Sequence, residues 1–254
     1  MNKSYIKHSF GNAAQTYDQQ APVQKWTAGF LADYVRDLNL GVDIDCLEIG
    51  CGTGFLTQEM VDLFPKAKWM ITDLSDQMIA TCRDRIGDGV TYQQMDGEFP
   101  NIEGKFDLIV TSLAVQWFSD LEAGLGRLAG LLKPGGHLVF TTLGKDSFCE
   151  WRDLLVKEGQ PVGLHDYPDL NTILSYQFND CAAVMQSHAK KQNYENGLAF
   201  LRALKLIGAQ APRKGYSPMG PAALKKVLAK LEDKTDCSMT YEILIGDVHK
   251  GMNI

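Results

Sequence analysis

The stretch from residue 46 to residue 55, CLEIGCGTGF, constrains the fold of this chain more than any other part of the sequence. An apolar run ends in glycines at three alternate positions, Gly50, Gly52 and Gly54, and a second apolar stretch begins at Phe55. Because glycine tolerates positive φ and lets the backbone approach a ligand closely, this pattern predicts a buried strand, a tight turn and a helix. The turn itself is the first candidate for a binding site.

Strand and helix patterns alternate through the first 143 residues. Short apolar runs predict strands, and apolar residues at spacings of three and four predict helices. The expected strands are 45–49, 67–72, 90–94, 106–112 and 137–143, and the expected helices are 23–38, 55–63, 75–86 and 121–132, with Ser75 as an N-cap and a turn at 133–136. This alternation predicts an α/β fold with a doubly wound, mainly parallel sheet and a binding crevice at the carboxyl ends of its strands.

The regular alternation of strand and helix patterns ends after residue 143. We expect helices at 147–158, 168–181, 195–208 and 220–232, a strand near 183–193 and a final strand at 240–248. With no internal repeat or linker, we interpret residues 1–254 as a single domain. Its expected parts are an N-terminal helical lid (1–40), a core (41–143), an inserted helical cap with a basic segment (144–235) and the final strand (236–254).

Composition narrows the class of protein. The N-terminal residues contain no apolar run typical of a signal peptide, and no stretch approaches the roughly 18 apolar residues of a membrane span. The six cysteines form no CxxC pair, and the five histidines show no ligand-like spacing. We therefore expect a soluble cytoplasmic protein with free thiols and no metal.

Charge is distributed unevenly along the chain. The formal net charge is −6, but residues 186–230 contain nine Lys and Arg residues and one acid, Glu195, which leaves this segment near +8. Such a segment is either a solvated helical face or a docking surface for an acidic partner.

The glycine turn excludes the usual dinucleotide fingerprint. That fingerprint, G-x-G-x-x-G, requires a third glycine at position 55, where this chain has Phe55. The pattern present is E-x-G-x-G-x-G, from Glu48 to Gly54. It resembles motif I of the class I S-adenosylmethionine-dependent methyltransferases, and the resemblance covers about residues 45–145. The resemblance implies a Rossmann-like sheet of seven strands and S-adenosylmethionine as the cofactor, with S-adenosylhomocysteine as its product.

The same resemblance assigns roles to individual residues. Asp73, after the second strand, matches the acid that accepts hydrogen bonds from the ribose hydroxyls, and Asp96 matches the acceptor for the adenine amino group. Taken alone, Asp73 is equally an N-cap and Asp96 a turn former. The full set of cofactor-binding residues that the resemblance implies is Glu48, Gly50, Cys51, Gly52, Gly54, Asp73, Leu74, Met78, Met95, Asp96, Gly97, Ser112 and Leu113.

Four stretches outside this core bear on the methyl acceptor. They are FGNAAQTYD (10–18), LAVQWFSD (113–120), LRALKLIGA (201–209) and MTYEILIGDV (239–248). Together they resemble the malonyl-acyl carrier protein O-methyltransferases of biotin biosynthesis over nearly the whole chain. The resemblance implies methylation of the free carboxylate of a malonyl thioester, on acyl carrier protein or coenzyme A, to the methyl ester that primes pimeloyl synthesis. The acidic carrier protein would dock on residues 186–230, and neither nucleic acid nor membrane is an expected partner.

A carboxylate acceptor determines which catalytic groups the site requires. It is ionised at neutral pH, so methylation requires no general base, and catalysis is mainly positioning, which contributes on the order of 7–11 kcal/mol. We expect Tyr17 and Arg202 to be the catalytic donors to the acceptor carboxylate. Gln116, Trp117 and Lys205 are the expected substrate-binding residues.

Three alternatives stay open at this point. Another small-molecule methyltransferase acting on a carboxylate or a quinone ring would share the same core. A nucleotide-binding oxidoreductase is disfavoured by Phe55. A non-catalytic cofactor sensor would bind the methyl donor without transferring its methyl group.

Overall fold

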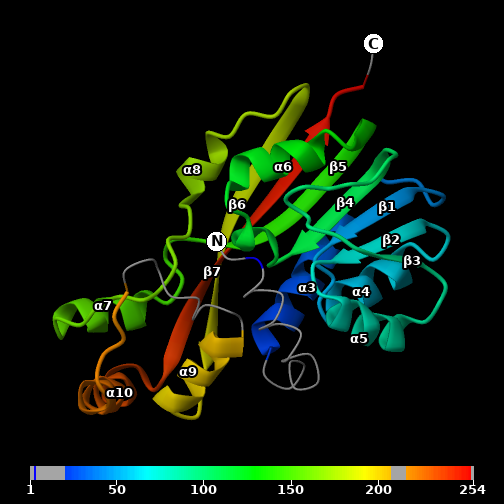
Figure 1. The fold of residues 1–254 in the computed structure, drawn as a ribbon. Coiled ribbons are helices and arrows are strands. Elements are labelled where there is room, and N and C mark those ends of the chain that lie inside the picture. Colours follow the sequence, from blue (N-terminus) through cyan, green and yellow to red (C-terminus); the bar gives the residue numbers. More distant parts are fainter. Residues whose placement is uncertain (1–2, 4–20, 207–215, 253–254) are drawn as a thin grey trace.

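The chain folds around one seven-stranded sheet with strand order β3-β2-β1-β4-β5-β7-β6 (Figure 1). The computed structural model describes residue 3, residues 21–206 and residues 216–252. The strands are β1 (Asp45–Ile49), β2 (Lys68–Asp73), β3 (Thr91–Gln94), β4 (Phe106–Ser112), β5 (Leu132–Leu143), β6 (Cys181–Asn193) and β7 (Ser238–Lys250). β1 to β5 pair in parallel, whereas β7 runs antiparallel to both β5 and β6.

Helices cover both faces of the parallel part of the sheet. The described helices are α3 (Pro22–Arg36), α4 (Phe55–Leu63), α5 (Asp76–Ile86), α6 (Leu121–Ala129), α7 (Cys149–Lys157), α8 (Leu170–Leu174), α9 (Gly197–Leu206), α10 (Pro221–Thr235) and the 3₁₀ turn η1 (Val115–Trp117). Figure 1 shows α3, α4 and α5 on one side of the sheet and α6 on the other. This is the doubly wound arrangement expected from the alternating sequence.

Two apolar cores explain why the central strands are apolar throughout. Along β1, Cys46 packs with α3, α4 and α5 on one face, and its neighbour Leu47 packs with α6 on the other. Side chains alternate across a strand, so a strand covered on both faces needs apolar residues at consecutive positions. Both residues are fully buried.

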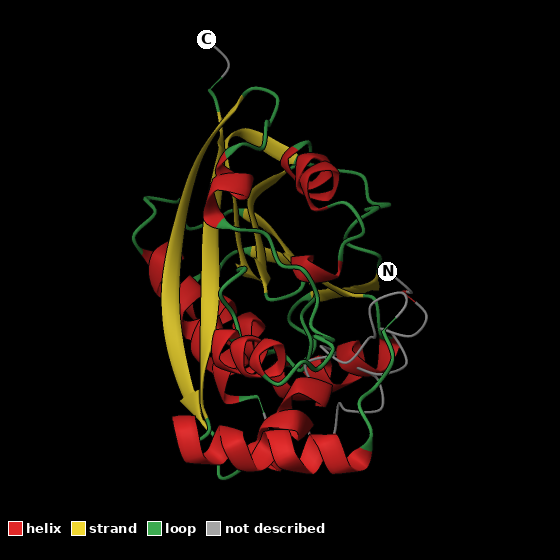
Figure 2. Cartoon of the chain, turned by 90° about the vertical axis from the view of Figure 1, so that its left-hand side faces the viewer, coloured by secondary structure: helices red, strands yellow, loops and turns green. Residues whose placement is uncertain are grey.

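A third core lies at the far end of β7. There α7, α9 and α10 pack around Phe200, Tyr241 and Leu231, which are buried. Figure 2 shows the two long strands β6 and β7 running from the sheet to these helices. The pairing of β6 with β7 extends over all thirteen residues of β6, from Cys181 to Asn193. The strands therefore join the helical part of the chain to the sheet.

Several predicted elements are confirmed. β1, α4 and β4 have the predicted bounds, and the Ser75 side chain caps α5 by accepting a hydrogen bond from the Met78 N–H. The strand predicted near 183–193 is β6. The final strand is longer than predicted at both ends, because every residue of β7 from Ser238 to Lys250 pairs with β6.

Three other predicted elements differ in extent from the structure, and the first is the helix expected at 121–132, which ends at Ala129 because Leu132 already belongs to β5. The helix expected at 168–181 is only Leu170–Leu174, because the chain turns at Ser175 and extends into β6 from Cys181. The turn expected at 133–136 lies inside β5 as an irregularity: Leu132 already pairs with Phe106 of β4, the next pair is His137 with Leu108, and the register shifts between them. Glycine permits this: a Cβ on Gly136 would lie 2.9 Å from the Phe106 carbonyl oxygen of the neighbouring strand.

Two further observations concern the described residues alone. None of their helices is long and apolar enough to cross a membrane, and no group of three or more His, Cys, Asp and Glu side chains among them could hold a metal ion. All six cysteines lie in this part of the chain as free thiols.

Candidate functional site

A pocket opens at the carboxyl ends of β1, β2 and β4, where the doubly wound fold places its crevice. It contains about 990 Å³ of empty space, part of which is open to solvent. The lining comes from the ends of β1, β2 and β4, from the loops that follow β1 to β4, from α3 and the first turns of α4 and α5, and from Lys3. The lining residues are Lys3, Gln24, Ala28, Glu48, Ile49, Gly50, Cys51, Gly52, Thr53, Phe55, Leu56, Asp73, Leu74, Met78, Met95, Asp96, Gly97, Ser112, Leu113, Ala114, Trp117 and Phe118.

The glycine turn forms the floor of the pocket, and each glycine is needed for a different reason. Gly50 has φ +71°, and a Cβ there would lie 2.4 Å from the Cβ of Ala114. Gly52 has φ +54° and faces open space, because a Cβ there would meet no atom of the described residues within 4 Å. Gly54 has φ +92° as the N-cap of α4, and a Cβ there would lie 3.0 Å from Cys82 Sγ of α5, so it shapes the turn without lining the pocket. The turn can therefore hold a ligand against its own backbone.

Asp73 at the end of β2 supports this turn. Its carboxylate accepts hydrogen bonds from the Gly52 N–H at 2.9 Å and from the Ser75 N–H at 2.8 Å. Burial raises the pKa of Asp73, and these backbone N–H groups act in the opposite direction. A carboxylate offers about four acceptor positions, so two remain for a ligand such as a diol.

Glu48 is the most deeply buried acid of the site. It is 1% exposed, and its Oε2 atom has no hydrogen-bond partner among the described residues. Burial raises the pKa of Glu48 well above the usual range of a carboxyl group, with only partial opposition from a hydrogen bond with Thr57. An unpartnered buried acceptor is costly, so this oxygen fits a ligand that brings a positively charged donor.

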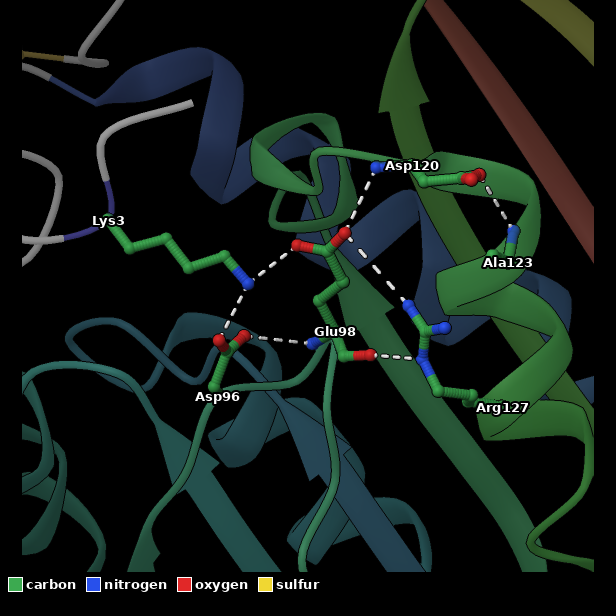
Figure 3. Close-up of polar contacts among 6 residues, drawn as sticks. All are labelled: Lys3, Asp96, Glu98, Asp120, Ala123 and Arg127. Carbon is green, nitrogen blue, oxygen red and sulfur yellow. Dashed lines mark hydrogen bonds and ion pairs between the residues drawn. The ribbon is translucent and has the colours of Figure 1, made fainter.

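The loop after β3 closes the other end of the pocket. The Met95 N–H donates to the Asp73 carbonyl at 2.9 Å, and a Cβ on Gly97 would lie 2.2 Å from Ile49 Cγ2. Between them, Asp96 faces the pocket and contacts Lys3 at 2.6 Å (Figure 3). Only glycine at position 97 lets this loop lie so close to the end of β1.

The loop after β4 forms the wall nearest the helical part of the chain. Leu113 has φ +49°, and its N–H donates to the Thr141 hydroxyl at 3.1 Å. Gln116 Nε2 donates to the Leu113 carbonyl at 2.7 Å, so this side chain braces the loop and does not line the pocket. Trp117 lines the pocket, and its ring packs edge-on against His165 at 5.9 Å.

The structure brings the predicted cofactor-binding residues together. All of them line this one pocket except Gly54, which lies beneath the turn. Of the predicted substrate-binding residues, Trp117 lines it as well. Arg202 and Lys205 are exposed on α9, outside the lining. Tyr17 lies outside the described residues.

The sequence reasoning missed several lining residues. Lys3 contacts Asp96 directly, and Gln24, Ala28 and Phe118 complete the walls. The apolar periodicity of residues 23–38 predicts α3 but does not say which of its residues face a ligand. A single lysine near the N-terminus carries no pattern at all, so only the fold reveals Lys3.

The core of the chain matches a known family. Residues 47–138 match the methyltransferase-domain family, and this range runs from within β1 to within β5 and includes the pocket loops that follow β1 to β4. Two solved structures share the fold at low sequence identity. The YcgJ protein from Bacillus subtilis has a TM-score of 0.62 at 16% identity, covering 89% of this chain and 99% of its own. The plantazolicin methyltransferase BpumL, solved in complex with S-adenosylhomocysteine, has a TM-score of 0.55 at 14% identity, covering 97% and 95%.

Curated relatives extend the similarity to nearly the whole chain. The malonyl-acyl carrier protein O-methyltransferase of Magnetococcus marinus is 35% identical over 245 residues, which is 95% of this chain and 90% of that protein. The enzyme of the same name from Bacillus cytotoxicus is 36% identical, covering 98% and 93%. The biotin biosynthesis bifunctional protein BioCD of Bordetella avium is 38% identical over 246 residues, and this chain spans about half of it, 52%.

Three observations point to the same family: the fold, the glycine turn with its pocket acids, and matches that extend over nearly the whole chain. The chain belongs to the malonyl-acyl carrier protein O-methyltransferase family, with the class I methyltransferase fold.

Proposed function

We propose that this protein transfers a methyl group from S-adenosylmethionine to the free carboxylate of a malonyl thioester carried by acyl carrier protein or coenzyme A. The observation that carries the proposal is the set of three pocket acids, Glu48, Asp73 and Asp96, which lie at or just beyond the carboxyl ends of three neighbouring strands. The family membership over nearly the whole chain supports the choice of acceptor.

The acids fit the cofactor by their chemistry. Glu48 offers a buried oxygen without a partner among the described residues, suited to an ammonium group, and Asp73 offers free acceptor positions, suited to ribose hydroxyls. Asp96 is placed beyond β3, where it suits the amino group of an adenine ring. When bound, S-adenosylmethionine supplies an electrophilic methyl group on a positively charged sulfur. The protein's own part is to bind, orient and exclude water.

The acceptor needs donors rather than a base. A malonyl carboxylate is already ionised at neutral pH, so its unreactive oxygen needs one or two fixed hydrogen-bond donors. Lys3 is the one cation among the described lining residues, and it is already paired with acids. We therefore retain Tyr17 and Arg202 as the proposed donors.

The basic segment is proposed as the docking surface for the acidic carrier protein. The structure distributes its described cations over β6, α9 and α10. Lys230 and Lys226 contact Glu158 at 2.5 and 3.7 Å, and Lys190 lies over the Trp26 ring at 5.0 Å. Lys191 and Lys205 are exposed. We expect these exposed cations to contribute most to encounter with the carrier, with an effect that weakens as salt rises.

A parallel acceptor panel tests the function. Purified protein is incubated with S-adenosylmethionine and malonyl-acyl carrier protein, malonyl-coenzyme A or free malonate, and both S-adenosylhomocysteine and the methyl ester are quantified. We expect transfer to the thioesters and little to free malonate. Binding of the cofactor without transfer to any acceptor would favour a sensor, transfer only to an unrelated carboxylate or quinone would favour another methyltransferase, and binding of NADH alone would favour an oxidoreductase.

A charge-reversal pair tests the docking surface separately. The double variant Lys191→Glu with Lys205→Glu should lower kcat/KM for malonyl-acyl carrier protein more than for malonyl-coenzyme A, and the difference should shrink at high salt. The matched control reverses Lys66 and Lys68, two exposed lysines beside the amino end of β2, which changes the net charge equally. Equal losses for both substrates, or an equal loss in the control, would remove the docking role.

A further inference from the structure

Lys3 joins two acids at the end of the pocket that is formed by the loop after β3 (Figure 3). Its ammonium group lies 2.6 Å from Asp96 Oδ2 and 2.5 Å from Glu98 Oε2. It also lies 4.5 Å from the centroid of the Phe99 ring. One cation thus connects a pocket acid, Asp96, to a deeper acid that does not line the pocket.

Glu98 is the deeper acid, and two cations and backbone N–H groups lie close to its carboxylate. It is 1% exposed, its Oε1 accepts from the Asp120 N–H at 3.0 Å, and Arg127 lies 4.0 Å from the same oxygen. Burial acts to raise the pKa of Glu98, but the hydrogen bond from Lys3 and the backbone N–H groups of Ser119 and Asp120 outweigh it and lower the pKa. Two cations therefore balance two carboxylates in this cluster, and removal of Lys3 would leave a buried negative charge short of a partner.

The cluster also fixes the direction of the Asp96 carboxylate. Its Oδ1 accepts from the Glu98 N–H at 3.0 Å while its Oδ2 contacts Lys3, so each oxygen is held by a different group. The Asp96 side chain nevertheless stays 31% exposed. Because a carboxylate has about four acceptor positions, it can still accept a hydrogen bond from a ligand in the pocket.

We propose that Lys3 is a positioning residue for the base of the cofactor: its contacts with Asp96 and Glu98 hold the Asp96 carboxylate in one direction, so that it selects a 6-aminopurine over a 6-oxopurine. The proposal rests on the proposed function, since it takes the pocket to bind S-adenosylmethionine. A fixed anionic acceptor gains a hydrogen bond from a 6-amino group and is repelled by a 6-oxo oxygen. A loosely held carboxylate turns away from the base, so it discriminates less.

The chain offers a closely matched control. Lys133 also bridges two carboxylates, Asp45 and Asp107, at 2.6 Å each. The three residues lie near the amino ends of β1, β4 and β5, whereas the pocket lies at the carboxyl ends of the parallel strands, and none of the three lines it. Lys133→Met therefore removes an equivalent bridge without touching the pocket.

The test titrates the full chain by calorimetry with S-adenosylhomocysteine and with S-inosylhomocysteine, in which an oxo group replaces the 6-amino group. We expect Lys3→Met to weaken binding of the 6-amino ligand about tenfold, which corresponds to about 1.4 kcal/mol, and to reduce its preference over the 6-oxo ligand by a similar factor. Lys3→Arg, which keeps the charge, should restore most of that preference, and Lys133→Met should leave it unchanged. Measurement of the preference as a ratio separates positioning from a general loss of folded protein, which would weaken both ligands alike.

The outcomes separate the two proposals. If wild-type protein binds S-adenosylhomocysteine and Lys3→Met keeps the wild-type preference, the role of Lys3 is wrong while the proposed function stands. A loss of preference in Lys133→Met equal to that in Lys3→Met would also overturn it. If wild-type protein binds neither ligand, the proposed function fails and this inference fails with it.

Discussion

Replacement of Gly50 by alanine gives a quantitative test of why the pocket turn needs glycine. Two separate penalties act at this position. The residue has φ +71°, and the new Cβ would lie 2.4 Å from the Cβ of Ala114. The left-handed conformation costs a non-glycine residue about 1–2 kcal/mol. Carbon atoms normally approach to about 3.5–4.0 Å, so the contact requires a backbone shift, and overpacking of this kind costs about 1–3 kcal/mol.

Gly50→Ala should therefore lower the free energy of unfolding by about 2–5 kcal/mol. Gly159→Ala isolates the first penalty, because Gly159 has φ +62° and nothing among the described residues lies within 4 Å of the new Cβ. It should cost only about 1–2 kcal/mol. Gly52→Ala, at φ +54° and equally open, should match Gly159→Ala in stability but weaken cofactor binding, because its Cβ enters the pocket.

Urea unfolding of the ligand-free protein, followed by circular dichroism, measures these differences. The double variant Gly50→Ala with Ala114→Gly removes the opposing Cβ, so the two substitutions should be less destabilising together than the sum of the single effects, by about 1–3 kcal/mol. Strict additivity, or a cost for Gly50→Ala no larger than that of Gly159→Ala, would refute the steric argument.

Three further predictions concern acids and donors. Burial raises the pKa of Glu48, so the folded protein keeps a proton that the unfolded chain loses above about pH 4.3, and the free energy of unfolding falls as pH rises from there. In urea unfolding, Glu48→Gln should therefore stabilise the ligand-free protein more at pH 8 than at pH 5, and it should weaken cofactor binding. A stability difference that does not depend on pH would contradict this. Asp120 accepts from the Ala123 N–H at 3.0 Å as the N-cap of α6, so Asp120→Ala should cost about 1 kcal/mol in the same assay, and no measurable loss would argue against the cap. Tyr17→Phe and Arg202→Gln should each lower the turnover of malonyl thioesters about tenfold, which corresponds to about 1.4 kcal/mol of lost hydrogen bonding. The Kd for S-adenosylhomocysteine should stay unchanged. A variant with wild-type turnover would remove its residue from the proposed mechanism.

The parts of the fold that the sequence predicts best are those with a local cause. β1 and α4 have the predicted bounds because a buried apolar run meets glycines with φ of +71°, +54° and +92°, which leaves the chain no other place to turn. The Ser75 cap is equally local, since its acceptor and donor lie three residues apart. Such features depend on neighbouring residues alone.

The parts that the sequence does not predict depend on distant neighbours. Pro134 and the two glycines after it favour a turn, yet β5 begins before them, because Leu132 already pairs with Phe106 of β4; the turn is taken up as an irregularity between this pair and the next, Leu108 with His137. Lys3 gains its place only through Asp96 and Glu98, 93 residues or more along the chain. Motif spacing predicts the cofactor-binding residues, but it does not predict that Lys3 and Glu98 hold one of them, Asp96, in place.

The place of β7 in the sheet affects how the chain can fold while the ribosome is still synthesising it. β7 follows every other strand in the chain, yet it lies between β5 and β6. While the ribosome is still adding residues beyond 237, the first five strands can already pair with one another, but β6 has no neighbour and the apolar residues around α7, α9 and α10 lack the strand that they pack against. The nascent chain must therefore keep β6 from aggregating until the last segment emerges and inserts, and a premature stop codon before β7 would yield a protein with a formed glycine turn and no completed cap.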